Sequence, residues 1–129
     1  MAKWIRKPGR LCWLQTDYVL PLPHPGRGGE DAWVSLAEQH LLVRSGFAWD
    51  GPWPLPRLRC LLRASLVHDA LYHLMRAGKI PWCSRQFADA VFRKLAVEDG
   101  APPWLAAVCY WAVRGFGGWR ARADWRRLG

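Results

Sequence analysis

The chain has 129 residues, of which 51% are hydrophobic, and this length suffices for one domain with a modest core. That hydrophobic content excludes a chain that is disordered overall. The net charge of +9 favours an anionic partner such as a phospholipid surface, an acidic protein or a nucleic acid, although solubility alone explains it equally well. No helix-turn-helix, zinc-finger or RNA-binding aromatic motif accompanies the charge, so specific nucleic-acid recognition is not expected.

The chain carries no expected targeting or membrane-spanning segment. The first ten residues, MAKWIRKPGR, are basic but contain no long apolar run, so we expect no signal peptide. No other segment has enough uninterrupted apolar residues to cross a bilayer. The four cysteines form no C-x-x-C pair, which argues against a zinc ribbon or a redox motif.

The first third of the chain is predicted to form a small antiparallel sheet. Residues 11–20 and 39–47 are short, apolar and rich in β-prone residues, and residues 31–38 favour a further strand or a short helix. The stretch WDGPWPLPRL at 49–58 contains three prolines and a glycine, which remove backbone donors and favour irregular conformations. We interpret it as an ordered loop that leads into a helix.

The remainder of the chain is predicted to be helical. Apolar residues recur at three- and four-residue steps from about residue 57 to 77, which indicates a helix with one buried face. Ser84 is a suitable N-cap for a second helix over 84–100, and Pro102 and Pro103 start a third over 103–116, since proline is tolerated in the first turn. Glycines supply the expected ends of the three helices: Gly78, Gly100 and the pair Gly117 and Gly118.

These elements indicate an α+β fold dominated by helices. A small N-terminal antiparallel sheet is followed by about three packed helices, of which two form an antiparallel pair because their connection is short. We expect a single domain over 1–129. It comprises a β-rich part at 1–48, a helical part at 49–118 and a basic tail rich in Trp and Arg at 119–129.

Two ionisable residues stand in the apolar run ASLVHDALY, at 64–72. His68 lies on the predicted buried face, and Asp69 lies about 100° further round the helix. Asp89 lies near the apolar stripe of the second helix, so an antiparallel pairing would bring it to His68. A histidine held by a carboxylate can act as a general base.

The same residues permit a purely structural interpretation. His68 can be a hydrogen-bonded core histidine, and Asp69 can face solvent. Asp89 has Arg85 and Arg93 at four-residue spacings, which is sufficient for ordinary ion pairs on a helix surface.

The order of the motifs resembles a family of domains of unknown function that is common in tailed phages and prophages. The matching elements are a G-F-x-x-D-G loop, an R-A-x-x-x-H-D-x-L-Y helix, an R-x-x-A-D-x-x-F helix and the later segment YWAVRGFGG, and together they cover roughly residues 44–118. The stretch GPWPLP replaces the small residues that usually follow the loop. The resemblance implies a phage-encoded protein located in the host cytoplasm or associated with the virion.

A weaker resemblance links the H-D-x-x-Y helix to phospholipases A2, especially the domain in parvovirus capsid proteins. It implies that His68 deprotonates a water, that Asp89 orients His68, and that Tyr72 supports Asp89 by a hydrogen bond. It also implies calcium as a cofactor, held by Asp69 and by the loop at 49–53. The expected loop residues are Trp49, Asp50, Gly51 and Trp53, with tryptophan where the enzymes have a tyrosine and a final glycine.

Two functions follow from these observations. The first is a calcium-dependent phospholipase A2-like hydrolase that cleaves a lipid ester, with its Trp- and Arg-rich ends on an anionic phospholipid surface. The second is a non-enzymatic virion, tail or host-interaction protein, in which His68 and Asp89 form a structural pair and the partners are other phage proteins.

Overall fold

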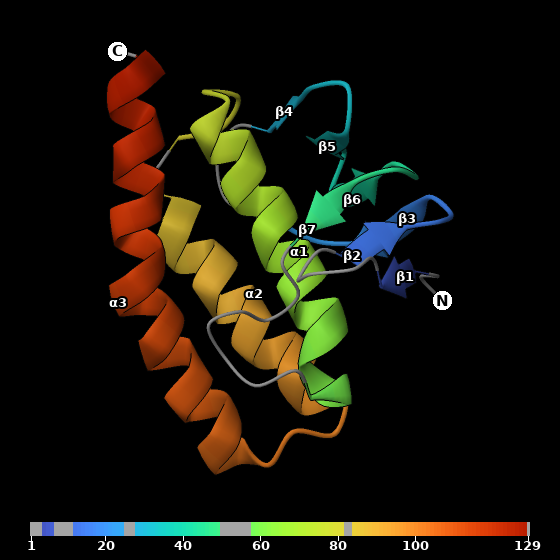
Figure 1. Cartoon of the computed structure of the whole chain (residues 1–129), viewed down its shortest axis with the longest axis vertical. Helices are drawn as coiled ribbons and strands as arrows, with labels where there is room; N and C mark the ends of the chain where they lie inside the picture. Colours follow the sequence, from blue (N-terminus) through green and yellow to red (C-terminus); the bar gives the residue numbers. More distant parts are fainter. Residues whose placement is uncertain (1–3, 7–11, 25–27, 50–57, 82–83, 129) are drawn as a thin grey trace.

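The chain folds as two small antiparallel sheets followed by three helices, as a computed structural model shows (Figure 1). The structure describes residues 4–6, 12–24, 28–49, 58–81 and 84–128, and it describes side chains in these ranges apart from 4–6 and 116–128. The expected α+β class is confirmed, and so is the order of sheet before helices.

The strands form two separate sheets rather than one. A three-stranded sheet has the order β1-β2-β7, and a four-stranded sheet has the order β3-β6-β5-β4. All the neighbouring strands are antiparallel. The strands are β1 (Trp4–Arg6), β2 (Cys12–Leu14), β3 (Tyr18–Pro21), β4 (Gly29–Glu30), β5 (Val34–Ala37), β6 (His40–Val43) and β7 (Ala48–Trp49).

The β-prone stretch at 11–20 does not belong to one sheet, because it contains β2 and most of β3, which lie in different sheets. The chain turns between them, where the side chain of Asp17 accepts a hydrogen bond of 2.8 Å from the backbone N–H of Ser45. Residues 31–38 contain the strand β5 and not a helix. Trp49, which we expected in the irregular loop, instead ends β7, and residues 50–57 of that expected loop lie outside the described residues.

The hairpin between β5 and β6 has an unusual turn. Ala37 pairs with His40, so only Glu38 and Gln39 make the connection. Both have positive φ, 52° and 64°, a combination that the type I′ hairpin turn requires and that Asn-Gly adopts more easily. This turn therefore holds two ordinary residues in a strained conformation.

The three helices are α1 (Arg59–Arg76), α2 (Arg85–Glu98) and α3 (Pro103–Leu128). Gly78 and Gly100 follow the ends of α1 and α2 with φ of +74° and +103°, as expected of glycines that stop a helix. Ser84 is the N-cap of α2, but its side chain makes no capping hydrogen bond.

The expected end of the third helix is wrong. The helix continues through Gly117 and Gly118 to Leu128, so residues 119–128 belong to α3 and are not a separate tail. A glycine inside a helix costs only about 1 kcal/mol, and the following run of Ala, Arg and Leu favours a helix. Two glycines without a following proline therefore do not stop it.

Helix α1 is the central element of the molecule. Figure 1 shows it between the strands on one side and α2 and α3 on the other, with α2 antiparallel to both of the other helices. Eleven of its residues are buried, including His68 and Tyr72. The largest fully buried side chains also include Phe92 of α2 and Leu14 and Leu41 of the strands, so a continuous core joins both faces of α1.

Candidate functional site

The histidine of the H-D pair lies directly against the carboxylate of the next helix. His68 is on α1 and Asp89 is on α2, and the Nε2 atom of His68 lies 2.6 Å from Oδ1 of Asp89. Asp89 is fully buried and His68 is 7% exposed. The antiparallel packing of α1 and α2 thus makes the contact that the spacing of the sequence predicts.

Tyr72 completes this arrangement from one turn further along α1. Its hydroxyl donates a hydrogen bond of 2.8 Å to the same Oδ1 atom of Asp89. The rings of His68 and Tyr72 lie with centroids 4.3 Å apart, and the edge of Phe92 lies against His68 at 5.5 Å. Burial and the neighbouring Asp89 carboxylate both raise the pKa of Tyr72, which therefore remains a hydrogen-bond donor.

Arginines occupy the other oxygen of Asp89. Arg114 of α3 donates a hydrogen bond of 3.2 Å to Oδ2, and Nε of Arg85 lies 3.8 Å from the same atom. Arg85 also donates to the backbone carbonyl of Arg114 at 2.8 Å. The guanidinium of Arg93 instead lies 5.6 Å from the centre of the Tyr110 ring, so an Asp89–Arg93 pair is not formed.

Arg114 is the member of this cluster that sequence reasoning missed. It lies in the segment YWAVRGFGG, which contributes to the family resemblance, but its spacing of 25 residues from Asp89 carries no periodic signal. Only the packing of α3 against α2 brings the two side chains together. An isolated arginine within an apolar helical segment is the available signal, because such a charge requires a buried partner.

Asp69 lies on the other side of the histidine ring. Its Oδ1 atom is 3.8 Å from Nδ1 of His68, which is an electrostatic contact rather than a hydrogen bond. The side chain of Asp69 is 25% exposed, whereas that of Asp89 is 0% exposed. The buried carboxylate of Asp89 therefore fixes the His68 ring from the interior, and the carboxylate of Asp69 lies on the side of the ring nearer to solvent.

The two carboxylates control the protonation of His68. Burial alone would lower its pKa, but Asp69 and Asp89 both favour the imidazolium, and together they raise the pKa above the ordinary 6.5. The proton donated by Nε2 to Asp89 leaves Nδ1 as the atom that can accept another. The geometry therefore suits general-base chemistry at Nδ1.

The loop expected to hold a metal begins at a well-anchored residue. Trp49 is 3% exposed, and its indole N–H donates a hydrogen bond of 3.1 Å to the hydroxyl of Ser65 on α1. The other expected loop residues, Asp50, Gly51 and Trp53, lie outside the described residues. Within the described part of the chain, no three His, Cys, Asp or Glu side chains are grouped so that they could hold a metal ion.

The comparisons with known proteins identify a family but no activity. The family model described as "Protein of unknown function (DUF1353)" matches residues 34–113. The chain belongs to this family, and its expected membership of a domain family of unknown function is thereby confirmed. No curated protein and no solved structure matches the chain. The matched region includes His68, Asp69, Tyr72 and Asp89.

Proposed function

We propose that this protein is a phage-encoded hydrolase of the phospholipase A2 kind, which cleaves a lipid ester with His68 as the general base. The observation that carries the proposal is the shared Oδ1 atom of Asp89. This atom lies 2.6 Å from Nε2 of His68 and 2.8 Å from the hydroxyl of Tyr72. A carboxylate fixed by two partners on a neighbouring helix sets both the tautomer and the orientation of the imidazole.

In this mechanism Nδ1 of His68 takes a proton from the attacking water. Asp89 stabilises the imidazolium that results, and Tyr72 keeps Asp89 in place. Arg114 and Arg85 lie against Oδ2 of Asp89 and balance its negative charge in the interior. The proton then passes from His68 to the leaving alcohol.

Calcium is the cofactor that fits the exposed carboxylate. Asp69 is an oxygen ligand of the kind that calcium prefers, and its side chain is accessible beside His68. It is one ligand only, and the other proposed ligands are backbone carbonyls of the loop at 49–53. When bound, the cation would polarise the ester carbonyl and stabilise the oxyanion.

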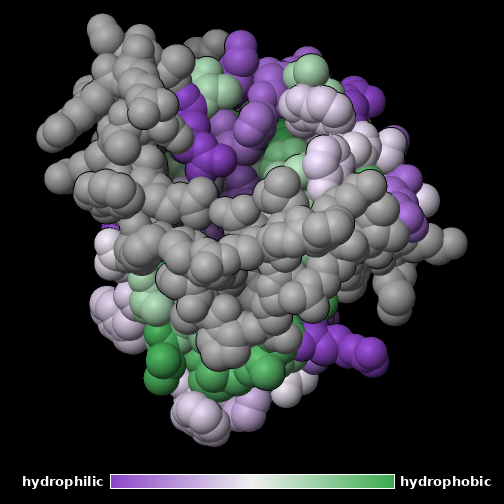
Figure 2. Space-filling model, viewed as in Figure 1, coloured by the Kyte–Doolittle hydropathy of each residue, from purple (hydrophilic) through white to green (hydrophobic). Residues whose placement is uncertain are grey.

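An anionic phospholipid surface is the partner that we propose for this activity. Trp104, Val108 and Trp111 lie on one face of α3 and are 69%, 58% and 68% exposed. Figure 2 shows hydrophobic residues (green) gathered near the start of α3. Tryptophans on an exposed helix face combined with a net charge of +9 suit the boundary of an anionic bilayer. Among the described residues, no helix has the length and apolar character needed to cross a membrane.

One observation favours a second candidate, a non-enzymatic virion, tail or host-interaction protein. His68 is 7% exposed. Asp89 of α2 contacts α1 through His68 and Tyr72, and it contacts α3 through Arg114. Such a network also serves to fix three helices in one arrangement. In this candidate the exposed face of α3 binds another protein of the particle or host.

A vesicle assay separates the two candidates. The purified protein is incubated with phosphatidylglycerol vesicles that carry a labelled acyl chain, with calcium or with chelator, and the released fatty acid is measured. We expect calcium-dependent release, and a loss of 10²-fold or more in His68→Ala because general-base catalysis contributes about 10²–10⁴-fold. His40→Ala is the matched control, because His40 is an exposed histidine in the β5–β6 hairpin.

Circular dichroism of each variant shows whether it is folded. Release that persists at the wild-type rate in a folded His68→Ala protein contradicts the proposed catalytic role. If the folded wild-type protein releases no fatty acid with calcium, the hydrolase proposal fails. A loss of stability in His68→Ala then supports the structural candidate.

A further inference from the structure

A second histidine–carboxylate pair lies on the opposite side of α1. Nε2 of His73 is hydrogen-bonded to Oδ2 of Asp31, which follows β4. The other oxygen of Asp31 accepts hydrogen bonds from the backbone N–H groups of Trp33 and Val34, at 2.9 and 3.0 Å. Burial would raise the pKa of Asp31, but these bonds and His73 lower it, so the carboxylate stays ionised and holds the imidazole in place.

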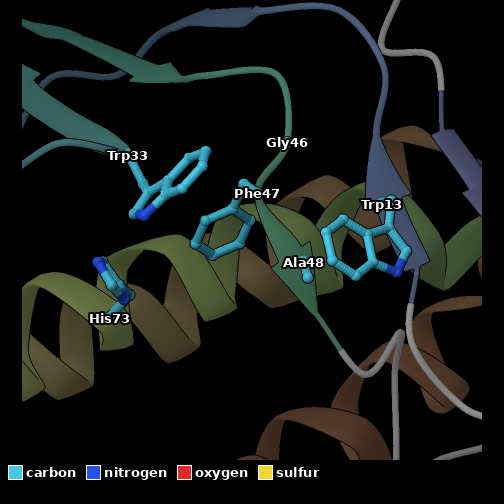
Figure 3. A pocket seen from close by; sticks show the side chains of 6 residues that line it. All are labelled: Trp13, Trp33, Gly46, Phe47, Ala48 and His73. Carbon is cyan, nitrogen blue, oxygen red and sulfur yellow. The ribbon is translucent and has the colours of Figure 1, made fainter.

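This pair adjoins a pocket with aromatic walls. The pocket has a volume of about 310 Å³ and is lined by Trp13, Trp33, Gly46, Phe47, Ala48 and His73. Figure 3 shows Phe47 between the two tryptophans, with His73 approaching from α1. The ring of Phe47 meets that of His73 edge to face, with centroids 5.7 Å apart. The side chain of His73 is 28% exposed, so this imidazole is more accessible than that of His68.

Gly46 fixes one wall of the pocket. Its φ is +95°, and a Cβ atom at this position would lie 2.9 Å from Cζ3 of Trp33. Only glycine therefore lets the Trp33 ring lie against this part of the backbone. Trp33 is 45% exposed, so its indole presents an accessible aromatic surface to a ligand.

The lining indicates the chemistry of the ligand. Among the described residues that line the pocket there is no lysine or arginine, so these residues offer no ammonium or guanidinium group to a phosphate or other anion. The rings favour a flat aromatic group that can stack or pack edge to face against them. Within the described residues Nδ1 of His73 has no hydrogen-bond partner, and with Nε2–H donated to Asp31 the lone pair of Nδ1 is available to accept a hydrogen bond.

We infer that this pocket binds an aromatic ring bearing an O–H or N–H donor, whose proton is accepted by Nδ1 of His73. The ring can belong to a free small molecule or to a tyrosine or tryptophan side chain of a partner. The inference is independent of the proposed hydrolase, because the pocket lies between α1 and the strands whereas His68 faces α2.

Titration of the ¹⁵N-labelled protein followed by NMR tests the inference. The probes are p-cresol, which carries a donor, and 4-methylanisole, which has the same ring without one. We expect saturable shifts centred on the amides of Gly46 and Ala48, and about tenfold tighter binding of p-cresol, the equivalent of one hydrogen bond. In His73→Phe the two probes should bind equally, and in Trp33→Ala both should bind more weakly.

His40→Phe is the matched control and should leave both affinities unchanged, because His40 lies outside the pocket. Equal affinities for the two probes in the wild-type protein overturn the inference, and this result needs no variant. Shifts centred elsewhere, or an unchanged preference for p-cresol in His73→Phe, overturn it as well. N-acetyltyrosinamide distinguishes the sources: it binds if the pocket takes a tyrosine of a partner, and only p-cresol binds if the pocket is restricted to small molecules.

Discussion

Removal of the Asp89 carboxylate should destabilise the protein strongly. Asp89 is 0% exposed and accepts hydrogen bonds from His68, Tyr72 and Arg114. Asp89→Ala leaves the buried Tyr72 hydroxyl without its acceptor, at about 1–3 kcal/mol. It also leaves the guanidinium of Arg114 without its carboxylate partner, and breaking a buried ion pair in this way costs about 3–5 kcal/mol in total. Arg114 regains some hydration because its side chain is 27% exposed, which places the expected loss near the lower value.

Asp69 supplies a matched control on the other side of the same histidine. Its side chain is 25% exposed and lies 3.8 Å from His68, so Asp69→Asn should cost less than about 1 kcal/mol. Asp89→Asn is the milder variant at the buried site, since it keeps the shape and one acceptor oxygen. We expect it to cost about 2–3 kcal/mol, because it weakens charge-assisted bonds without leaving a cavity.

Urea unfolding monitored by tryptophan fluorescence measures these differences. With an m-value of about 1–3 kcal/mol/M, Asp89→Asn should lower the midpoint by about 0.7–3 M, and Asp69→Asn should lower it much less. Equal midpoints for the two asparagine variants would refute the reasoning. Such a result would mean that the carboxylate of Asp89 contributes no more than an exposed one.

Two further predictions concern the histidine and the strained turn. Burial would lower the pKa of His68, but Asp69 and Asp89 raise it above 6.5 in the folded protein. The stability that the protonated His68 contributes is therefore fully present below pH 6.5, and it is lost as the pH rises through the pKa of His68 in the folded protein. The difference in unfolding free energy between the wild-type protein and His68→Gln should therefore fall over this interval, and a difference that grows with pH would contradict it. In the β5–β6 hairpin, Glu38→Asn combined with Gln39→Gly should raise the unfolding free energy by about 1 kcal/mol, since both positions have positive φ. Thermal unfolding measures this change, and a lower melting temperature would show that the two side chains make stabilising contacts.

The helical part of the fold could be predicted because its signals are local. The apolar period of α1 and the glycines that follow α1 and α2 lie within the elements that they define, and all of them are where the sequence places them. The contact between His68 and Asp89 follows from the same periodicity, given only that α1 and α2 are antiparallel neighbours. The geometry of the contact, rather than any catalytic role, is what the sequence could supply.

The strands and the remaining contacts depend on long-range pairing, which local patterns do not report. Nothing within residues 11–20 indicates that β2 pairs with β7 while β3 pairs with β6. The bond between Asp31 and His73 joins residues 42 apart in the sequence, and that between Arg114 and Asp89 joins residues 25 apart. Each exists because two elements pack together, so neither is visible as a motif.

The placement of both histidines on α1 explains how one helix can support two separate sites. His73 lies five positions after His68, which turns its side chain about 140° round the helix from that of His68. Because α1 lies between the strands and the other helices, one histidine faces α2 and the other faces the turn after β4 (Figure 1). Their exposures differ accordingly, with side chains 9% and 28% exposed. The conspicuous H-D motif therefore marks the more buried histidine, while the more accessible one beside the aromatic pocket carries no motif.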